Sequence, residues 1–231
     1  MSTRRHAQRR GRRHIATHSK LTGSVWGPTV LAISLCAAFV TTVFTGSNVV
    51  APTQAHDESL DTVLAFLVPD ECETMLLTEL VIASTGVATG TSANELILGS
   101  ADADVIDGRG GDDCIIGGAN NDEIRGGTGA DTIYGQAGED RIEGENGWDT
   151  IYGGSDDDWI DAGNGLDTVY GGSGDDTIYG RGKPDTIFGG SGDDTIYGNN
   201  DGDTINGGDD QDECIGGKGI DVFVQCEVET P

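Results

Sequence analysis

The chain repeats itself every nine residues from Gly90 to Val224, fifteen times, without an insertion or a deletion. Position one of the repeat is Gly in every copy except one, where it is Ala162. Position eight is Ile or Val in thirteen copies, and position six is acidic in all of them. A fixed period of this length indicates a solenoid, in which each repeat packs only on its neighbours. The pattern therefore argues against an ordinary globular fold with one central core.

Each column of the repeat has a physical reason. The first six residues are rich in Gly, which adopts the left-handed conformations needed in tight turns, so we predict a turn there. The last three residues alternate as in a strand, with position eight pointing inward and positions seven and nine pointing outward. Two nonapeptides then make one coil, with strands about 4.8 Å apart. The predicted fold is all-β: a right-handed parallel β-roll with turns along both edges.

The carboxylates of these turns are the candidate metal ligands. Glu95 occupies position six of the first copy, which we expect to serve as an edge more than as a site. The other copies have Asp at position six: Asp104, Asp113, Asp122, Asp131, Asp140, Asp149, Asp158, Asp167, Asp176, Asp185, Asp194, Asp203, Asp212 and Asp221. Asp also replaces Gly at position four in four copies, which gives either extra ligands or simple turn residues: Asp102, Asp156, Asp201 and Asp210.

Calcium suits these turns better than other cations. One buried Ile in nine residues offsets only part of the entropy cost of ordering them, and rows of carboxylates oppose compaction. Ca2+ is a hard cation that takes six to eight oxygens from carboxylates and carbonyls. Sites between repeats n and n+2 would hold at most about thirteen ions. We expect the site near Lys183, in the repeat Gly180–Phe188, to be impaired.

The charge is divided unevenly along the chain. The whole sequence contains 40 acidic and 13 basic residues, for a net charge of -27. Residues 1–55 hold seven of the bases and no acid, so the rest of the chain has a net charge of -34. Because phosphate binding requires clustered Lys and Arg, nucleic acid is excluded as a partner of this body. Divalent cations are its natural counterions.

Two of the copies, Gly171–Tyr179 and Gly189–Tyr197, read directly as GGxGxDxUx. The array resembles the repeats-in-toxin (RTX, haemolysin-type) calcium-binding repeat family, and the resemblance covers 135 of 231 residues. It implies a parallel β-roll that folds on binding Ca2+ outside the cell, with the position-six Asp as side-chain ligand. Many members carry the array beside a catalytic or pore-forming domain and a C-terminal secretion signal. Neither is visible in this sequence, so toxin activity does not follow.

The first 55 residues have the layout of an export signal. A basic segment ends at Lys20, no charged residue occurs from Leu21 to His56, and the apolar stretch is densest between Val30 and Phe44. We expect cleavage after Ala55, with a twin-arginine route as an option, and the alternative is an uncleaved membrane anchor. Both place the acidic body outside the cell. A membrane is a partner only in the second case.

The flanks of the array are short. We interpret residues 56–89 as an N-terminal cap, because a solenoid end exposes apolar surface and strand edges. Residues 225–231 form a C-terminal tail. Four Cys remain outside the leader, and they predict two disulfides, Cys72–Cys114 and Cys214–Cys226, since each pair straddles one end of the array. Zinc binding is a weak rival, because no CxxC pair exists.

The sequence favours a binding role over catalysis. The Asp pairs recur identically along an edge, whereas a catalytic pair is one constellation in a cleft, and no G-x-S-x-G or H-E-x-x-H motif exists. We therefore expect a secreted, non-catalytic calcium-binding protein. The alternative is an adhesion or surface-layer component whose outward Thr and aromatic side chains contact a glycan or a protein. Such side chains also simply favour exposed strands and stack across rungs.

Overall fold

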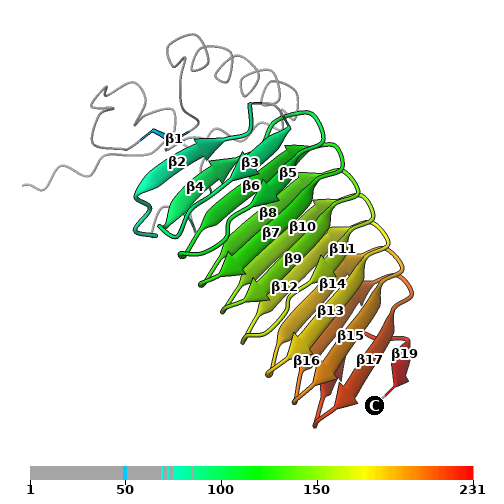
Figure 1. The fold of residues 1–231 in the computed structure, drawn as a ribbon. Helices are drawn as coiled ribbons and strands as arrows, with labels where there is room; N and C mark the ends of the chain where they lie inside the picture. Colours follow the sequence, from blue (N-terminus) through cyan, green and yellow to red (C-terminus); the bar gives the residue numbers. More distant parts are fainter. Residues whose placement is uncertain (1–48, 51–68, 70–71, 73–74, 85, 231) are drawn as a thin grey trace, which may run out of the picture.

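The repeats form a parallel β-solenoid of stacked coils, seen in a computed structural model (Figure 1). The structure describes residues 49–50, 69, 72, 75–84 and 86–230. Every named element within this part of the chain is a β-strand. The predicted all-β parallel roll is therefore confirmed.

The strands belong to two sheets, which we call sheet A and sheet B. Sheet A consists of β1 (Val49–Val50), β2 (Glu79–Ile82), β4 (Glu95–Leu98), β6 (Cys114–Ala119), β8 (Thr132–Ala137), β10 (Thr150–Ser155), β12 (Thr168–Ser173), β14 (Thr186–Ser191), β16 (Thr204–Asp209) and β18 (Val222–Val224). Sheet B consists of β3 (Val87–Thr89), β5 (Val105–Asp107), β7 (Glu123–Thr128), β9 (Arg141–Asn146), β11 (Trp159–Asp161), β13 (Thr177–Gly182), β15 (Thr195–Asn200), β17 (Glu213–Lys218) and β19 (Val228–Thr230).

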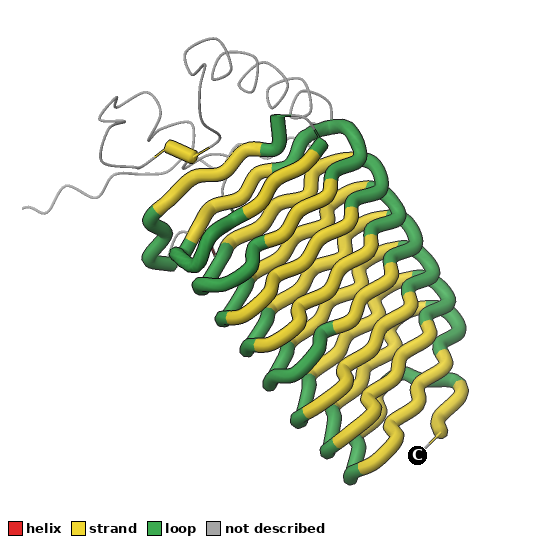
Figure 2. The backbone as a smooth tube through the Cα atoms, viewed as in Figure 1, coloured by secondary structure: helices red, strands yellow, loops and turns green. Residues whose placement is uncertain are grey.

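Odd and even repeats alternate between the two sheets. From β4 to β18, sheet A contains positions seven to nine of the odd repeats, continued in most strands by positions one to three of the following even repeat. From β5 to β17, sheet B contains positions seven to nine of the even repeats, continued in most strands by positions one to three of the following odd repeat. Neighbouring strands pair in parallel, with partners eighteen residues apart, as for Tyr134, Tyr152 and Tyr170. Two repeats therefore make one coil, as the sequence predicted, and the connecting turns run along both edges (Figure 2).

Most of the strands are longer than the three residues that the sequence predicted. β10 runs through Gly153 and Gly154 to Ser155, and Gly154 and Ser155 pair with Gly172 and Ser173 of β12. The backbone ladder continues here because it needs no side chain, so the Gly-rich positions one to three belong to the strand. The turns are correspondingly shorter, at about positions four to six.

The main core consists of the column of position-eight side chains between the two sheets, and a second, smaller cluster at the N-terminal end contains Cys72, Leu96, Cys114 and Ile116. Twelve Ile side chains of the position-eight column are fully buried: Ile97, Ile106, Ile115, Ile124, Ile133, Ile142, Ile151, Ile160, Ile178, Ile187, Ile196 and Ile205. Val169 and Cys214 occupy the same column, also with no exposed surface. The side chains at positions seven and nine of each strand face outward and are mostly half-buried.

At the N-terminal end the solenoid begins before the first repeat. β2 pairs in parallel with β4, and β3 pairs in parallel with β5, so each sheet has a rung ahead of the array. A disulfide joins Cys72 to Cys114, which confirms the predicted pairing. β1 pairs antiparallel with β2 and lies within the predicted leader, the rest of which is outside the described residues. Among the described residues, no helix is long and apolar enough to cross a membrane.

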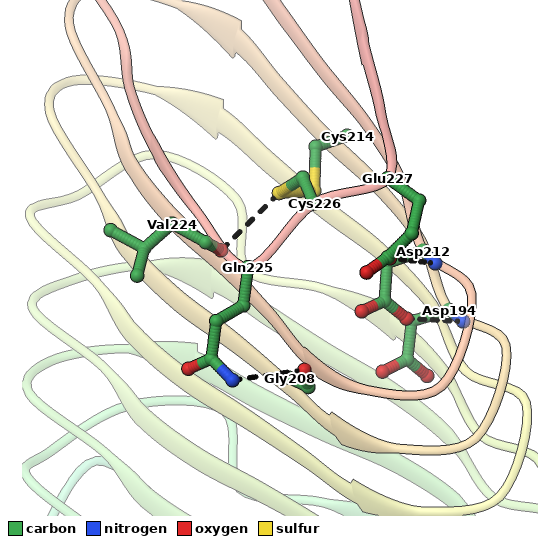
Figure 3. Close-up of a disulfide and its surroundings, with 8 residues drawn as sticks. All are labelled: Asp194, Gly208, Asp212, Cys214, Val224, Gln225, Cys226 and Glu227. Atoms are coloured by element: carbon green, nitrogen blue, oxygen red, sulfur yellow. Dashed lines mark hydrogen bonds between the residues drawn. A yellow bond between two sulfur atoms is a disulfide. The ribbon is translucent and has the colours of Figure 1, made fainter.

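At the C-terminal end the tail adds a rung to sheet B. β19 pairs in parallel with β17, and the disulfide between Cys214 and Cys226 was also predicted correctly (Figure 3). The Gln225 side-chain amide donates a hydrogen bond to the Gly208 carbonyl, and the Gly208 amide donates one to the Gln225 carbonyl. These contacts fix the last segment of the chain against the final repeats.

Candidate metal-binding rims

The position-six carboxylates lie along the two edges of the solenoid, which we call the odd rim and the even rim. The odd rim contains positions one to six of the odd repeats, and its carboxylates run from Glu95 to Asp221. The even rim contains the same positions of the even repeats, from Asp104 to Asp212. Because two repeats make one coil, equivalent residues on a rim are stacked and lie eighteen residues apart.

One oxygen of each position-six carboxylate from Asp113 to Asp221 accepts a hydrogen bond in a ladder that runs along the rim. The backbone N–H of Asp113 donates to Asp131 Oδ1 at 2.9 Å, and the next rung repeats this contact from Asp131 to Asp149. Along both rims these distances are 2.8–3.0 Å. The ladder fixes each carboxylate between two rungs, facing inward and shielded from water.

The second oxygen of most of these carboxylates is buried without a hydrogen-bond partner among the described residues. The atom is Oδ2 in Asp113, Asp122, Asp131, Asp140, Asp149, Asp158, Asp167, Asp176, Asp185, Asp194, Asp203 and Asp212. In Asp104 it is Oδ1, because Oδ2 accepts hydrogen bonds from Ser100. A buried carboxylate oxygen without a donor is costly, so a row of them points to a missing cation.

The unpartnered oxygens face backbone carbonyls across a gap that only Gly leaves open. A Cβ added at Gly126 would lie 2.6 Å from Asp131 Oδ2 and 3.0 Å from the Gly144 carbonyl oxygen. The position-one Gly of the other repeats has the same two kinds of neighbour, except Gly99, which meets only backbone atoms, and Gly216, which meets only the Asp221 side chain. Position one is therefore Gly because a side chain would fill the space between a carboxylate and a carbonyl two repeats further on.

Burial changes the protonation of the rim carboxylates. Desolvation is the largest cause in every case, and it raises the pKa of Asp149, Asp158 and Asp185 to about 8. It raises the pKa of Asp131 and Asp176 to about 6. Neighbouring Asp charges raise these values further, whereas the backbone N–H donors lower them. The cation-free rims therefore disfavour the charged carboxylates that bind metal, and a bound cation would restore them.

The turn backbone explains the Gly residues at positions two and four. Both positions are left-handed in most repeats, as at Gly172 (φ 127°) and Gly174 (φ 129°). Ten residues that replace Gly at these positions adopt the same region with a φ of 65–84°: Arg109, Asn120, Gln136, Glu145, Asp156, Arg181, Lys183, Asn199, Asp201 and Asp210. A side chain at such a position costs about 1–2 kcal/mol, except that Asn and Asp tolerate it better.

The donor set fits calcium. Among the described residues, no three His, Cys, Asp or Glu side chains converge in a cluster that would hold a metal. A cation on a rim would therefore be held by position-six carboxylates together with backbone carbonyls, which is the oxygen-only mixture that Ca2+ accepts. A softer metal that prefers Cys or His would find no suitable ligands there.

The structure separates the two sets of predicted ligands. The position-six Asp residues line the rims and are buried, except Asp221, which is half-buried and accepts the Asp203 N–H. The position-four residues Asp102, Asp156, Asp201 and Asp210 are exposed, so they lie outside the buried row. Their role as ligands stays a prediction.

Glu227 belongs to the even rim and was missed by the sequence reading. The Asp212 N–H donates to Glu227 Oε2 at 2.8 Å, so this residue ends the even ladder (Figure 3). Its spacing of fifteen residues from Asp212, instead of eighteen, hid it from a search for the nine-residue period. Glu95 begins the odd ladder in the same way, since its N–H donates to Asp113 Oδ1.

The outward faces of the two sheets differ in charge. On sheet A, the rings of Tyr134, Tyr152, Tyr170 and Phe188 are stacked with centroids 4.6–4.9 Å apart. Positions seven and nine of β6 to β16 carry no charged residue. Sheet B instead carries ion pairs such as Arg181 with Asp161, at 2.7 Å. The predicted Thr and aromatic ladder is therefore present on sheet A.

Comparison with known protein families matches residues 89–223 to the RTX calcium-binding nonapeptide repeat, in overlapping blocks of four copies. The matched stretch covers more than half of the chain and coincides with the two rims. Comparison with curated proteins returned no match.

Proposed function

The chain belongs to the RTX calcium-binding nonapeptide repeat family, and from this premise we propose that it is a secreted, non-catalytic calcium-binding β-roll that folds on binding Ca2+ outside the cell. One observation carries the proposal: each rim buries a row of carboxylate oxygens that have no hydrogen-bond partner among the described residues. A divalent cation would remove the cost of burying these oxygens in their charged form.

The proposed ligands are the position-six Asp residues and the backbone carbonyls beside the position-one Gly. When bound, calcium supplies positive charge that neutralises the stacked carboxylates. The chain's own residues hold the carboxylates in place through the N–H ladder, exclude water from them, and keep position one free of side chains. Asp102, Asp156, Asp201 and Asp210 are proposed as additional ligands from the outer side of the turns.

Several features support folding outside the cell. The two disulfides suit an oxidising compartment. Extracellular calcium modules bind with dissociation constants of about 0.1–1 mM, so the rims would be empty in the cytosol and filled outside. We propose that residues 1–55 direct export and that cleavage follows Ala55. Determining the N-terminal residue of the secreted protein by mass spectrometry tests this, and an intact leader on a membrane fraction would favour the anchor.

The carboxylates do not support a catalytic role. The position-six carboxylates have the same surroundings on rung after rung, with one oxygen in the N–H ladder and the other buried without a partner among the described residues. A catalytic pair is instead a single constellation in a cleft. Hydrolase screening of the calcium-loaded chain should therefore detect no turnover above that of a buffer blank.

We also propose that residues 56–89 cap the N-terminal end. β2 and β3 place one rung in front of the first repeat, and the Cys72–Cys114 disulfide ties this region to β6. A cap of this kind protects the apolar column and the open strand edges from self-association. Removal of residues 56–78 should increase aggregation of the calcium-loaded protein in light scattering, and an unchanged scattering signal would contradict the cap.

A second candidate function is a calcium-stabilised adhesion or surface-layer component. The observation that favours it is the uncharged columns at positions seven and nine of β6 to β16 in sheet A, which are unusual in a chain of such high negative charge. Replacing Tyr152 and Tyr170 with Ser in the calcium-loaded protein tests it. An adhesion role predicts loss of glycan retention or of self-association, whereas a purely structural stack predicts a lower melting temperature and no change in either.

Isothermal titration of the chelated chain with Ca2+ tests the main proposal. We expect saturable binding of several ions, at most about thirteen, with sub-millimolar to millimolar affinity. Mg2+ is the control, because it demands smaller octahedral geometry and keeps its waters. Equal binding of Mg2+, or no binding of Ca2+, would overturn the proposal.

A further inference from the structure

We propose that the two rims bind calcium with different affinities, and that the even rim fills first. This inference rests on the proposed function and names the residues that divide its sites into two classes. Both rims contain position-six Asp residues that are more than nine-tenths buried and have an unpartnered oxygen among the described atoms, so both are built to take cations. They differ in charge, in the left-handed turn residues, and at positions one and five.

The first difference is charge. Positions one to six of the even repeats contain fifteen acidic residues and no Lys or Arg. The same positions of the odd repeats contain eleven acidic residues and four bases, which are Arg109, Arg181, Lys183 and Lys218. The odd rim has eight repeats and the even rim seven, so the even rim has more negative charge in a shorter row. Calcium affinity in oxygen sites rises with ligand and neighbouring charge.

The second difference lies in the left-handed turn positions. On the odd rim, Arg109 (φ 70°), Arg181 (φ 78°) and Lys183 (φ 84°) occupy positions where Gly is preferred. Lys183 brings both backbone strain and a positive charge to its turn, whereas Arg181 and Arg109 bring the strain but have their charges paired with Asp161 at 2.7 Å and with Asp107 at 3.8 Å. On the even rim, the left-handed non-Gly residues are neutral or acidic, such as Gln136 and Asp156, so they bring no repulsion.

The third difference is the gap at position one. The even rim has Gly at position one in all seven repeats. The odd rim has Ala162, which is fully buried. At the next odd repeat, a Cβ on Gly180 would lie 2.7 Å from Asp185 Oδ2 and 3.0 Å from the Gly198 carbonyl oxygen. A methyl group at position one therefore occupies space beside the proposed ligands.

The fourth difference is at position five. On the even rim, the Asp175 N–H donates to Asp157 Oδ1 at 2.8 Å and the Asp193 N–H donates to Asp175 Oδ1 at 2.9 Å, which makes an outer row of exposed carboxylates. On the odd rim, three repeats have a large apolar residue at position five, where Trp148, Leu166 and Ile220 are 70%, 46% and 89% exposed. On the odd rim the described residues contain one such carboxylate, Asp112, which accepts the Ala130 N–H, so the even rim has the longer outer row of carboxylates.

The four differences act in the same direction, and they separate the sites into two classes. We expect dissociation constants that differ by about tenfold between the rims, because site charge and rigidity tune calcium affinity over this range. We expect the difference in calcium affinity between the rims to be largest at residues 171–197. There, two even repeats that begin with GGSGDD flank the odd repeat that contains Arg181 and Lys183.

Matched Asn variants of the full chain test the proposal. Asp176→Asn lies on the even rim and Asp185→Asn on the odd rim, in adjacent repeats and with similar burial. Asn keeps an oxygen that can accept the N–H of the neighbouring rung, at 2.8 Å for Asp176 and 3.0 Å for Asp185, so the ladder survives in both variants. Titration calorimetry should show that Asp176→Asn removes ions from the tight class and Asp185→Asn removes ions from the weak class.

Two further measurements keep the test decisive if one variant folds poorly. Lys183→Gly should lower the dissociation constant of the weak class severalfold and leave the tight class unchanged. The fluorescence of Trp148, next to Asp149 on the odd rim, should change only in the weak phase, with Trp148→Phe as the control. One class of equivalent sites, or equal effects of Asp176→Asn and Asp185→Asn on both classes, would overturn the two-rim proposal and leave calcium binding intact. Absence of any calcium binding by the unaltered chain would instead overturn the proposed function.

Discussion

The position-one Gly residues offer a direct test of how the rims are built, and Gly117→Ala is the informative change. The new methyl would lie 2.5 Å from Asp122 Oδ2, 2.8 Å from the Gly135 carbonyl oxygen and 3.0 Å from the Ile124 Cδ1 atom. Two of these neighbours belong to the backbone or to the fixed carboxylate row. The structure must therefore shift to admit the methyl, and the space between the two oxygens becomes smaller.

The size of the effect follows from two opposing contributions. Overpacking of a well-filled interior costs about 1–3 kcal/mol. Replacing Gly by Ala at a position that is not left-handed returns about 0.4–1 kcal/mol by restricting the unfolded chain. We expect a net loss of about 1–2 kcal/mol in the calcium-loaded state, together with weaker calcium binding at Asp122.

Gly182→Ala is the matched control. A Cβ at Gly182 has a single neighbour within 4 Å, Asn164 Oδ1 at 3.6 Å, and the backbone there is not left-handed. This variant should be as stable as the unaltered chain or slightly more stable. Urea denaturation in excess Ca2+ measures both variants, and titration calorimetry measures their calcium binding. If Gly117→Ala matches Gly182→Ala in both assays, the argument that position one is kept open for the rim oxygens is wrong.

Three further changes test other parts of the account. Ile151→Ala removes a fully buried core side chain and should cost about 2–5 kcal/mol by calorimetry of the calcium-loaded protein; a loss below about 1 kcal/mol would contradict a main core of position-eight side chains. Glu227→Ala leaves the buried Asp212 N–H without an acceptor and should cost about 1–3 kcal/mol in urea, whereas no loss would show that the even ladder ends earlier. In chelator, burial raises the pKa of Asp149 and Asp158 from the usual range near 4 to about 8, so the folded state holds more protons than the unfolded state between these values. The stability of any cation-free fold should therefore be greatest below about pH 4 and fall as the pH rises to about 8; urea midpoints that rise with pH in EDTA would refute this.

Much of the fold could be predicted because the repeat imposes it on every coil. Ile133 and Ile151, eighteen residues apart, pair across neighbouring strands as two nonapeptides per coil require. The pairing of Cys214 with Cys226 followed from their positions at the end of the array, and the structure confirms it. Because the same turn and strand residues recur in every repeat, the conformational preference of any single residue has little influence on the fold.

The features that could not be predicted are those that a side-chain pattern does not record. Gly153 and Gly154 read as turn residues, yet they extend β10 because the backbone forms its ladder without side chains. The Oδ1 ladder from Asp113 to Asp131 depends on the stacking distance between rungs, which only the structure supplies. Glu227 occupies the next rung after Asp212 through a shorter connection, which breaks the period.

The central claim is that the rims hold the solenoid together only when they carry cations. The most direct measurement is far-ultraviolet circular dichroism of the full chain, first in excess EDTA and then during titration with Ca2+ at neutral pH. The account predicts little strand signal in EDTA and a cooperative gain of it near millimolar Ca2+. A strand-rich, heat-resistant protein in EDTA whose spectrum and melting temperature do not respond to the ion would contradict it.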